Sequence, residues 1–262
     1  MCFSPEVDLI GGAAIAAIGL DTLRHVDHDN ERAVASLPVI FGLHQVVETF
    51  VWWGLDGRVT VQVGDVAAWL YLARAFGLLP WFVPLAVRRL EPDPRRRYYD
   101  LLLIGIGAVV SAYLMAAVVR GPIEVVDGGF YLSYSVSITY GGTITALYVL
   151  STCGSLLLSS DRYLARYGVA NLGAVVVLSV LLVSGVISLW CVWAAITSVA
   201  IAIHLRRTDV HRHRFAMLAR SNPEHAKKLF ALAQKDIDDQ WHYYEQMAGI
   251  VRDMSGNGES ND

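Results

Sequence analysis

Charged residues are scarce in this sequence, and its lysines are confined to one end. Asp, Glu, Lys and Arg make up 17% of the chain, against about 25% in a typical soluble domain. The lysines, Lys227, Lys228 and Lys235, all lie in the last forty positions. Because a retinal chromophore needs a lysine inside the helix bundle to form its Schiff base, the sequence excludes a retinylidene photoreceptor.

Cysteines and known catalytic motifs are also few. Cys2, Cys153 and Cys191 form neither a zinc-ligand pattern nor a disulfide framework. A serine-hydrolase elbow, a phosphate-binding loop and a dinucleotide fingerprint are all absent. The first apolar run follows Glu6 and Asp8 instead of a basic segment, so we expect it to be a helix of the protein and not a cleaved signal peptide.

Long apolar runs dominate what is present. The chain is 55% hydrophobic, with a mean hydropathy of +0.44. A helix needs about 20 mostly apolar residues to cross a bilayer. This predicts an all-α polytopic membrane protein, a bundle of seven transmembrane helices over residues 7–23, 35–55, 65–87, 100–119, 140–158, 168–185 and 186–205. Only Ser184 and Gly185 divide the last two runs, so six spans are the alternative.

Arginines alternate between the loops and so predict the orientation. Positive charge concentrates in cytoplasmic loops. Basic loops join spans 1–2, 3–4 and 5–6 and follow span 7, with Arg24, Arg32, Arg88, Arg89, Arg95, Arg96, Arg97, Arg162, Arg166, Arg206, Arg207, Arg212 and Arg214. The other connections hold only Arg58 and Arg120. We therefore expect the N-terminus outside, the C-terminus in the cytoplasm, and the protein in the cell membrane.

Two segments are predicted to lie outside the bilayer. The outer loop, residues 120–139, has an Asp-Gly-Gly turn between β-prone runs, which fits either a hairpin or a plain loop. The tail, residues 206–262, is expected to be soluble, with a helix over about 222–253 capped by Asn222 and a disordered end at 255–262.

The tail helix repeats apolar residues every seven positions, at Phe230, Ile237, Tyr244 and Val251. This pattern favours packing on a cytoplasmic partner or on a second copy of the chain. The alternative is a single amphipathic helix lying on the membrane surface. We expect no nucleic-acid partner.

Two ionisable residues inside predicted spans indicate where function is to be sought. Glu48 lies about 10 Å from the outer end of span 2, and Arg74 about 13 Å from the outer end of span 3. An ionisable group in hydrocarbon is costly and usually faces the bundle interior. Antiparallel neighbours bring these two to similar depth, so we predict that they form an ion pair.

Other polar residues share that depth. His44 and Gln45 lie four and three positions before Glu48, on the same helix face. Tyr113, Tyr148 and Cys191 reach a comparable level in spans 4, 5 and 7. The pattern predicts a polar pocket in the outer half of the bundle, with either a structural helix clamp or a ligand, ion or proton site at its centre. For the two tyrosines, interhelical hydrogen bonds are the simpler interpretation.

A metal site is not predicted. His44 and Glu48 are spaced as zinc ligands on a helix, but two ligands are too few. A third would have to be Cys191 or Cys2, and the sequence shows neither to be close. We expect no cofactor.

Three stretches, "MCFS" at residues 1–4, "HQVVETFVW" at 44–52 and "SLWCVWAA" at 188–195, occur in an order that resembles a family of uncharacterised prokaryotic multi-pass membrane proteins beginning Met-Cys-Phe-Ser. The resemblance covers residues 1 to about 205. It implies a site made of Cys2, Gln45, Glu48, Trp52, Trp190 and Cys191. The chain departs from the family pattern at Thr49, where relatives have glycine, and at His44. The resemblance implies positions and no activity.

Three hypotheses follow. The first is a sensor or transporter that binds a small ligand, ion or proton at the outer pocket around Glu48 and Arg74. The second is an intramembrane hydrolase, metal-assisted or not, using Glu48 and His44. The third keeps Glu48 and Arg74 as a structural clamp alone.

Overall fold

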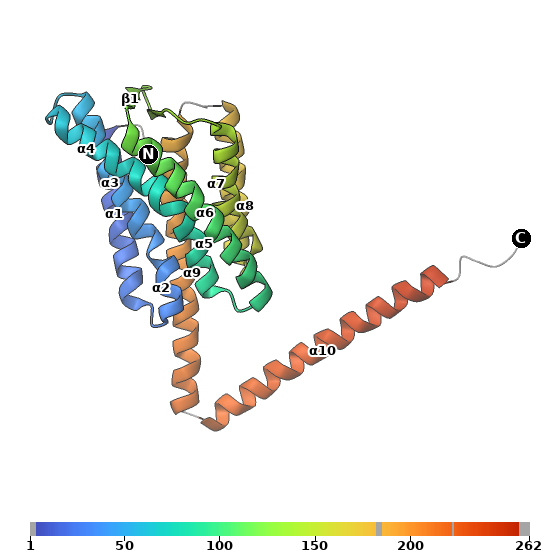
Figure 1. Cartoon of the computed structure of the whole chain (residues 1–262). Helices are drawn as coiled ribbons and strands as arrows, with labels where there is room; N and C mark the ends of the chain where they lie inside the picture. Colours follow the sequence, from blue (N-terminus) through green and yellow to red (C-terminus); the bar gives the residue numbers. More distant parts are fainter. Residues whose placement is uncertain (1–3, 182–184, 222, 257–262) are drawn as a thin grey trace, which may run out of the picture. The chain divides into compact units, whose positions relative to one another are not determined.

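The computed structural model describes residues 4–181, 185–221 and 223–256, and its regular structure is almost entirely helical (Figure 1). Contacts divide the chain into two units, Met1–Arg207 and Thr208–Asp262. The helices are α1 (Pro5–His25), α2 (Asp29–Ala35), α3 (Leu37–Leu55), α4 (Val61–Leu72), the π-helix η1 (Ala73–Leu78), α5 (Leu79–Leu90), α6 (Pro94–Arg120), α7 (Gly141–Leu158), α8 (Arg162–Leu181), α9 (Val186–Ser221) and α10 (Pro223–Gly256).

Six helical stretches in the described part of the chain are long and apolar enough to cross a membrane. They are Asp29–Leu55, Val61–Leu90, Pro94–Arg120, Gly141–Leu158, Arg162–Leu181 and Val186–Arg207, and they overlap the second to seventh predicted spans. The first predicted span forms α1, which carries Glu6, Asp8 and Asp21 and is not among the six. The chain therefore has the helices of a multi-pass membrane protein, as predicted.

Helices α1 and α3 approach closely because glycines line their contact. A Cβ on Gly12 would lie 2.7 Å from the carbonyl oxygen of Gly42, and one on Gly42 would lie 2.4 Å from the amide nitrogen of Ala16. Small residues spaced in this way allow helix backbones to touch. At the far end of the contact, the Thr49 hydroxyl donates to the carbonyl of Pro5 at 3.3 Å. This packing holds the first turns of α1 beside the last turns of α3.

The helix from Val61 to Leu90 changes its hydrogen-bond register in the middle, where η1 joins α4 to α5. The N–H of Leu79 donates to the carbonyl of Arg74, five residues back. Continuing this register would pair Pro80 with the carbonyl of Ala75, but proline has no N–H to donate. A π-turn of this kind is uncommon and is often found at functional sites.

Helix α6 crosses this turn at a glycine. A Cβ on Gly107 would lie 1.9 Å from the carbonyl oxygen of Pro80, which is far inside contact distance. On the same helix, Gly105 has no atom within 4 Å of the corresponding position. The crossing therefore requires glycine at 107 and not at 105.

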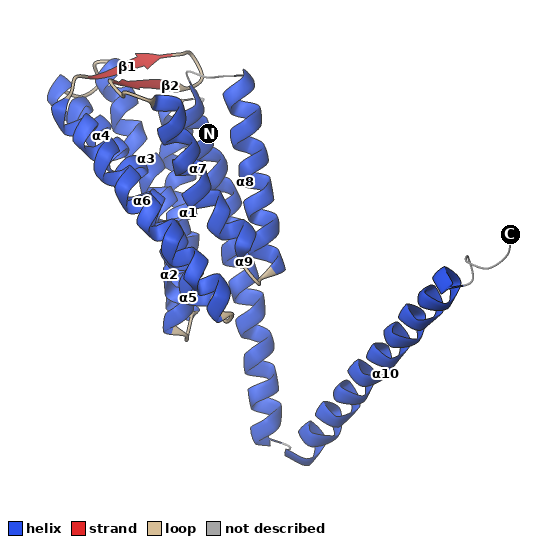
Figure 2. Ribbon diagram, turned by 45° about the vertical axis from the view of Figure 1, so that its right-hand side comes forward, coloured by secondary structure: helices blue, strands red, loops and turns tan. Residues whose placement is uncertain are grey.

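The segment between α6 and α7 forms the predicted hairpin. Strands β1 (Ile123–Asp127) and β2 (Leu132–Val136) pair antiparallel, with Ile123 opposite Val136. Figure 2 shows the hairpin lying across one end of the helices. Leu132 and Tyr134 alternate with more exposed neighbours and are buried. The hairpin alternative is thus confirmed over the plain loop, and one face of β2 points into the bundle.

The second unit contains the predicted tail helix as α10. Its apolar residues Phe230, Ile237, Trp241 and Tyr244 are all exposed in the single chain. Packing on a partner or on a second copy remains a prediction. The predicted cap, Asn222, lies outside the described residues, as does the predicted disordered end from position 257.

We predict that Gly107→Ala lowers the free energy of unfolding by about 2 kcal/mol or more, because the added methyl group meets a backbone carbonyl that cannot move aside. Gly105→Ala is the matched control. It should raise the free energy of unfolding by up to about 1 kcal/mol, because alanine has a higher helix propensity than glycine. Denaturant titration of both variants in lipid bicelles measures the difference. Equal effects would contradict the close crossing.

Candidate functional site

Glu48 is fully buried on α3 and binds hydroxyl groups from two distant segments. Its Oε1 accepts from the Ser188 hydroxyl on α9 at 2.8 Å and from the Tyr134 hydroxyl on β2 at 3.4 Å. The carboxyl group therefore joins α3, the hairpin and the last helix of the bundle. Its burial confirms the prediction that it faces the interior of the bundle, and we take it as the centre of the candidate site.

Asp8 is a second, fully buried carboxyl group at the same place. Its Oδ2 accepts from the indole N–H of Trp52 at 3.1 Å, and its Oδ1 has no hydrogen-bond partner among the described residues. Trp52 lies one helical turn after Glu48 on α3, so Asp8 lies beside the part of this helix that carries Glu48. The glycine contact between α1 and α3 brings the two acids together.

A stack of three aromatic rings connects the site to the hairpin. The ring of His44 on α3 lies 3.8 Å from that of Tyr71 on α4, at an interplanar angle of 19°. Tyr71 in turn stacks on Tyr134 at 4.6 Å and 11°. Tyr134 is therefore held from both ends, by its ring on Tyr71 and by its hydroxyl on Glu48. The stack positions a residue of the hairpin within the bundle.

His44 and Gln45 bring polar atoms to the same buried region. Both side chains are at least 97% buried, with exposed fractions of 1% and 3%. Neither ring nitrogen of His44 and neither amide atom of Gln45 has a hydrogen-bond partner among the described residues. A buried polar group costs free energy unless it is hydrogen-bonded, so this face of α3 suits a polar ligand.

The predicted ion pair between Glu48 and Arg74 is not formed between these two described residues. Arg74 is half-buried and donates instead to the carbonyl of Leu43 at 3.1 Å. Leu43 lies five residues before Glu48, which is about 7.5 Å along the helix and about 140° around it. The similar depths of Glu48 and Arg74 correctly predicted that Arg74 lies beside α3. The prediction did not consider the angle of each residue around the helix axis. Arg74 contacts the more exposed side of α3.

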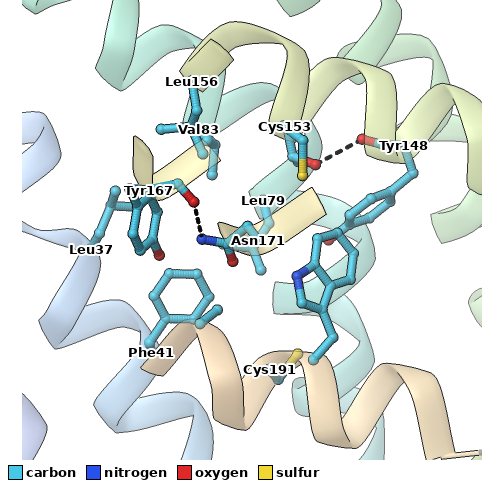
Figure 3. A pocket seen from close by; sticks show the side chains of 13 residues that line it. Leu37, Phe41, Leu79, Val83, Tyr148, Cys153, Leu156, Tyr167, Asn171 and Cys191 are labelled. Atoms are coloured by element: carbon cyan, nitrogen blue, oxygen red, sulfur yellow. Dashed lines mark hydrogen bonds between the residues drawn. The ribbon is translucent and has the colours of Figure 1, made fainter. Parts of the chain in front are cut away.

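Tyr148, Trp190 and Cys191 belong to a neighbouring, apolar region. They line a small cavity of about 40 Å³, together with Leu37, Phe41, Leu79, Val83, Thr152, Cys153, Leu156, Tyr167, Asn171 and Ala194. Figure 3 shows the labelled side chains around it, with Cys153 and Cys191 on different helices. The Asn171 amide donates to the carbonyl of Tyr167 at 2.9 Å. Cys191 also lies three residues after Ser188, the α9 residue that donates to Glu48, so it borders both regions.

Tyr148 supplies a hydrogen-bond donor to the Ala75 carbonyl, which Pro80 cannot supply because it has no N–H. Its hydroxyl donates to the carbonyl of Ala75 at 2.7 Å, the group that the π-register would have paired with the proline nitrogen. Tyr113, the other predicted tyrosine, is partly exposed and donates to the carbonyl of Thr139 at 2.7 Å. The predicted interhelical hydrogen bond is therefore confirmed for Tyr148, whereas Tyr113 binds the loop that precedes α7.

The described residues contain no group of three His, Cys, Asp or Glu side chains arranged to hold a metal ion. Cys2, which the sequence offered as a further ligand or site residue, lies outside the described residues.

Four residues of the site were not among the predicted ones: Asp8, Tyr71, Tyr134 and Ser188. Asp8 had a signal, since it is an ionisable residue within the first predicted span. Ser188 is the first residue of the "SLWCVWAA" stretch that carried the family resemblance. Tyr71 and Tyr134 had none, because an aromatic residue in a span or outer loop is common at membrane interfaces.

Apolar helices around a buried acidic centre define the chain as a helical, multi-pass membrane protein. The chain belongs to a family of unknown function (DUF6629), which matches residues 1–216. The predicted resemblance to an uncharacterised family is thus confirmed. That its members are prokaryotic and begin Met-Cys-Phe-Ser remains a prediction.

One further similarity is local. The chain is 40% identical over 57 residues to a Synechocystis protein whose name is that of a pyruvate-flavodoxin oxidoreductase. The match spans 21% of this chain and 5% of that protein, so it carries no function across. No solved structure matches the chain.

We predict that Tyr148→Phe lowers the free energy of unfolding by about 1–3 kcal/mol, because the Ala75 carbonyl then stays buried without a donor. Tyr113→Phe removes the same hydroxyl from a more exposed hydrogen bond and should cost less than about 1 kcal/mol. Unfolding titrations of both variants in bicelles provide the comparison. A Tyr148→Phe variant as stable as the wild type would show that the carbonyl does not depend on this hydroxyl.

Proposed function

We propose that this protein is a sensor or transporter of the cell membrane that binds and releases a proton, or a small cation in its place, at the Asp8–Glu48 carboxyl pair. The observation that carries the proposal is that two carboxyl groups lie fully buried, with Asp8 bound by Trp52, one helical turn after Glu48 on α3. Two adjacent negative charges in a water-poor bundle are strongly unfavourable. A shared proton or a bound cation removes this repulsion.

The partners of Glu48 support a change of protonation. The hydroxyls of Ser188 and Tyr134 donate to the carboxylate, and a hydroxyl can also accept a hydrogen bond from a protonated carboxyl group. The same two partners therefore serve both states. An arginine or lysine side chain could serve only the charged state, because it has no acceptor.

The proposed topology has seven spans, with α1 as the first and with the hairpin on the outer side. Near the hairpin the arginines outside the spans are few, Arg58 and Arg120, whereas the basic loops lie at the opposite end of the bundle. The positive-inside rule then places the basic end in the cytoplasm. A proton bound at Glu48 would act on the outer hairpin through Tyr134.

Infrared difference spectroscopy against pH, on the protein in lipid nanodiscs, tests the proposal. We expect the wild type to show the carbonyl band of a buried carboxylic acid that appears and disappears with pH. Asp8→Asn and Glu48→Gln should each remove or shift this band, because each removes one member of the pair. Adding sodium ions at constant pH distinguishes a cation, which would displace the proton, from a site that takes protons alone.

Glu6→Gln is the matched control, two residues from Asp8 on α1. Glu6 is exposed and accepts from Arg58 at 2.7 Å, and this contact raises the pKa of Arg58. The variant should keep the band of the wild type. Spectra of Asp8→Asn and Glu48→Gln that match the wild type would overturn the proposal. A second result would also overturn the proposal: both variants lose stability, and the wild type shows no pH-dependent band. This is the result expected if the two acids act only as a structural clamp.

A further inference from the structure

A second cavity, of about 290 Å³, lies among η1, α6, α7, α8 and α9 on the other side of Tyr148 and Trp190. Its walls are mostly apolar, with Ala75, Phe76, Leu114, Ile144, Val186 and Ile187 among them. The hydroxyl of Tyr148 is already bound to a backbone carbonyl. The cavity therefore offers hydrocarbon surface and few hydrogen-bonding groups.

The cavity opens at the surface between α7 and α8. Thr145 on α7 and Ser179 on α8 both line it and are both exposed. The neighbouring outer surface of α8 is apolar, with Val176, Val180 and Leu181 more than half exposed. In a helix long and apolar enough to span a membrane, such a surface faces lipid chains and not water.

We propose that the acyl chain of a membrane phospholipid enters between α7 and α8 and occupies this cavity. An apolar cavity of this size is a poor site for water, because each buried water needs two to four polar partners. Left empty, it would be strongly destabilising, since its lining would lose van der Waals contacts on one side. A hydrocarbon chain supplies those contacts, and the lipid surface of α7 and α8 is its direct source.

The proposal is independent of proton binding at Asp8 and Glu48, but the two sites are neighbours. Cys191 lines the acyl-chain cavity and lies three residues after Ser188, which donates to Glu48. The ring pair of Tyr148 and Trp190, 5.4 Å apart and edge to face, separates the cavity from the small one in Figure 3.

Photolabelling tests the occupant. The full-length protein is placed in phosphatidylcholine vesicles that carry a diazirine on one acyl chain, irradiated, and mapped by mass spectrometry. Phe76 and Leu114 line the cavity but are only 8% and 3% exposed, so only a chain that enters can label them. Val109 on α6 is 70% exposed and reports lipid around the protein. We expect label at all three positions.

Gly141→Phe should prevent photolabelling of the residues that line the cavity. Gly141 lines the cavity, and nothing lies within 4 Å of a Cβ placed there, so the ring can fill the space that the chain would occupy. Labelling of Phe76 and Leu114 relative to Val109 should fall about tenfold, equivalent to about 1.4 kcal/mol of binding. Gly142→Phe is the matched control: position 142 is equally open and exposed but does not line the cavity, so labelling should not change.

Label at Val109 without label at Phe76 or Leu114 in the wild type would overturn the proposal, and this readout does not depend on any variant folding. Equal labelling of the wild type and a folded Gly141→Phe variant would also overturn it. Interior labelling by a free fatty acid carrying the diazirine, with none by the phospholipid, would show that the occupant is not a bilayer lipid.

Discussion

The scarcity of hydrogen-bond partners inside the bundle is the main constraint on this structure. Water is scarce among apolar helices, so a backbone or side-chain group without a partner is costly. Pro80 withholds one N–H, and the Ala75 carbonyl, which the π-register would pair with it, accepts the hydroxyl of Tyr148 instead. A single missing donor thus fixes a contact between η1 and α7.

The same requirement explains why the acidic centre draws on distant segments. Glu48 takes its hydroxyl donors from α9 and from the hairpin, and Asp8 takes an indole N–H from α3. The glycine contact between α1 and α3 makes room for both acids at one level. Stability and proposed function therefore rest on the same contacts, and a variant at this centre has to be examined for both.

Much of the fold was predictable because hydropathy and length determine which segments can cross a bilayer. The long apolar runs became helices, and the Asp-Gly-Gly turn became a hairpin. Glu48 was identified because a charge in a span is conspicuous. The partners of Glu48 were not predicted, because they depend on the angle of each residue around its helix axis. Arg74 lies beside α3 but contacts the carbonyl of Leu43 and not Glu48. Nor could periodicity show that Tyr134, from a loop, would enter the bundle.

The acidic centre is assembled from α1, α3, β2 and α9, so its parts are separated by almost the whole of the first unit. While the chain is being made, Glu48 is present long before Ser188 exists to donate to it. Tyr134 joins the centre only after the hairpin has formed. Completion of the centre thus marks the end of insertion, and a chain stopped before α9 leaves Glu48 without its Ser188 donor.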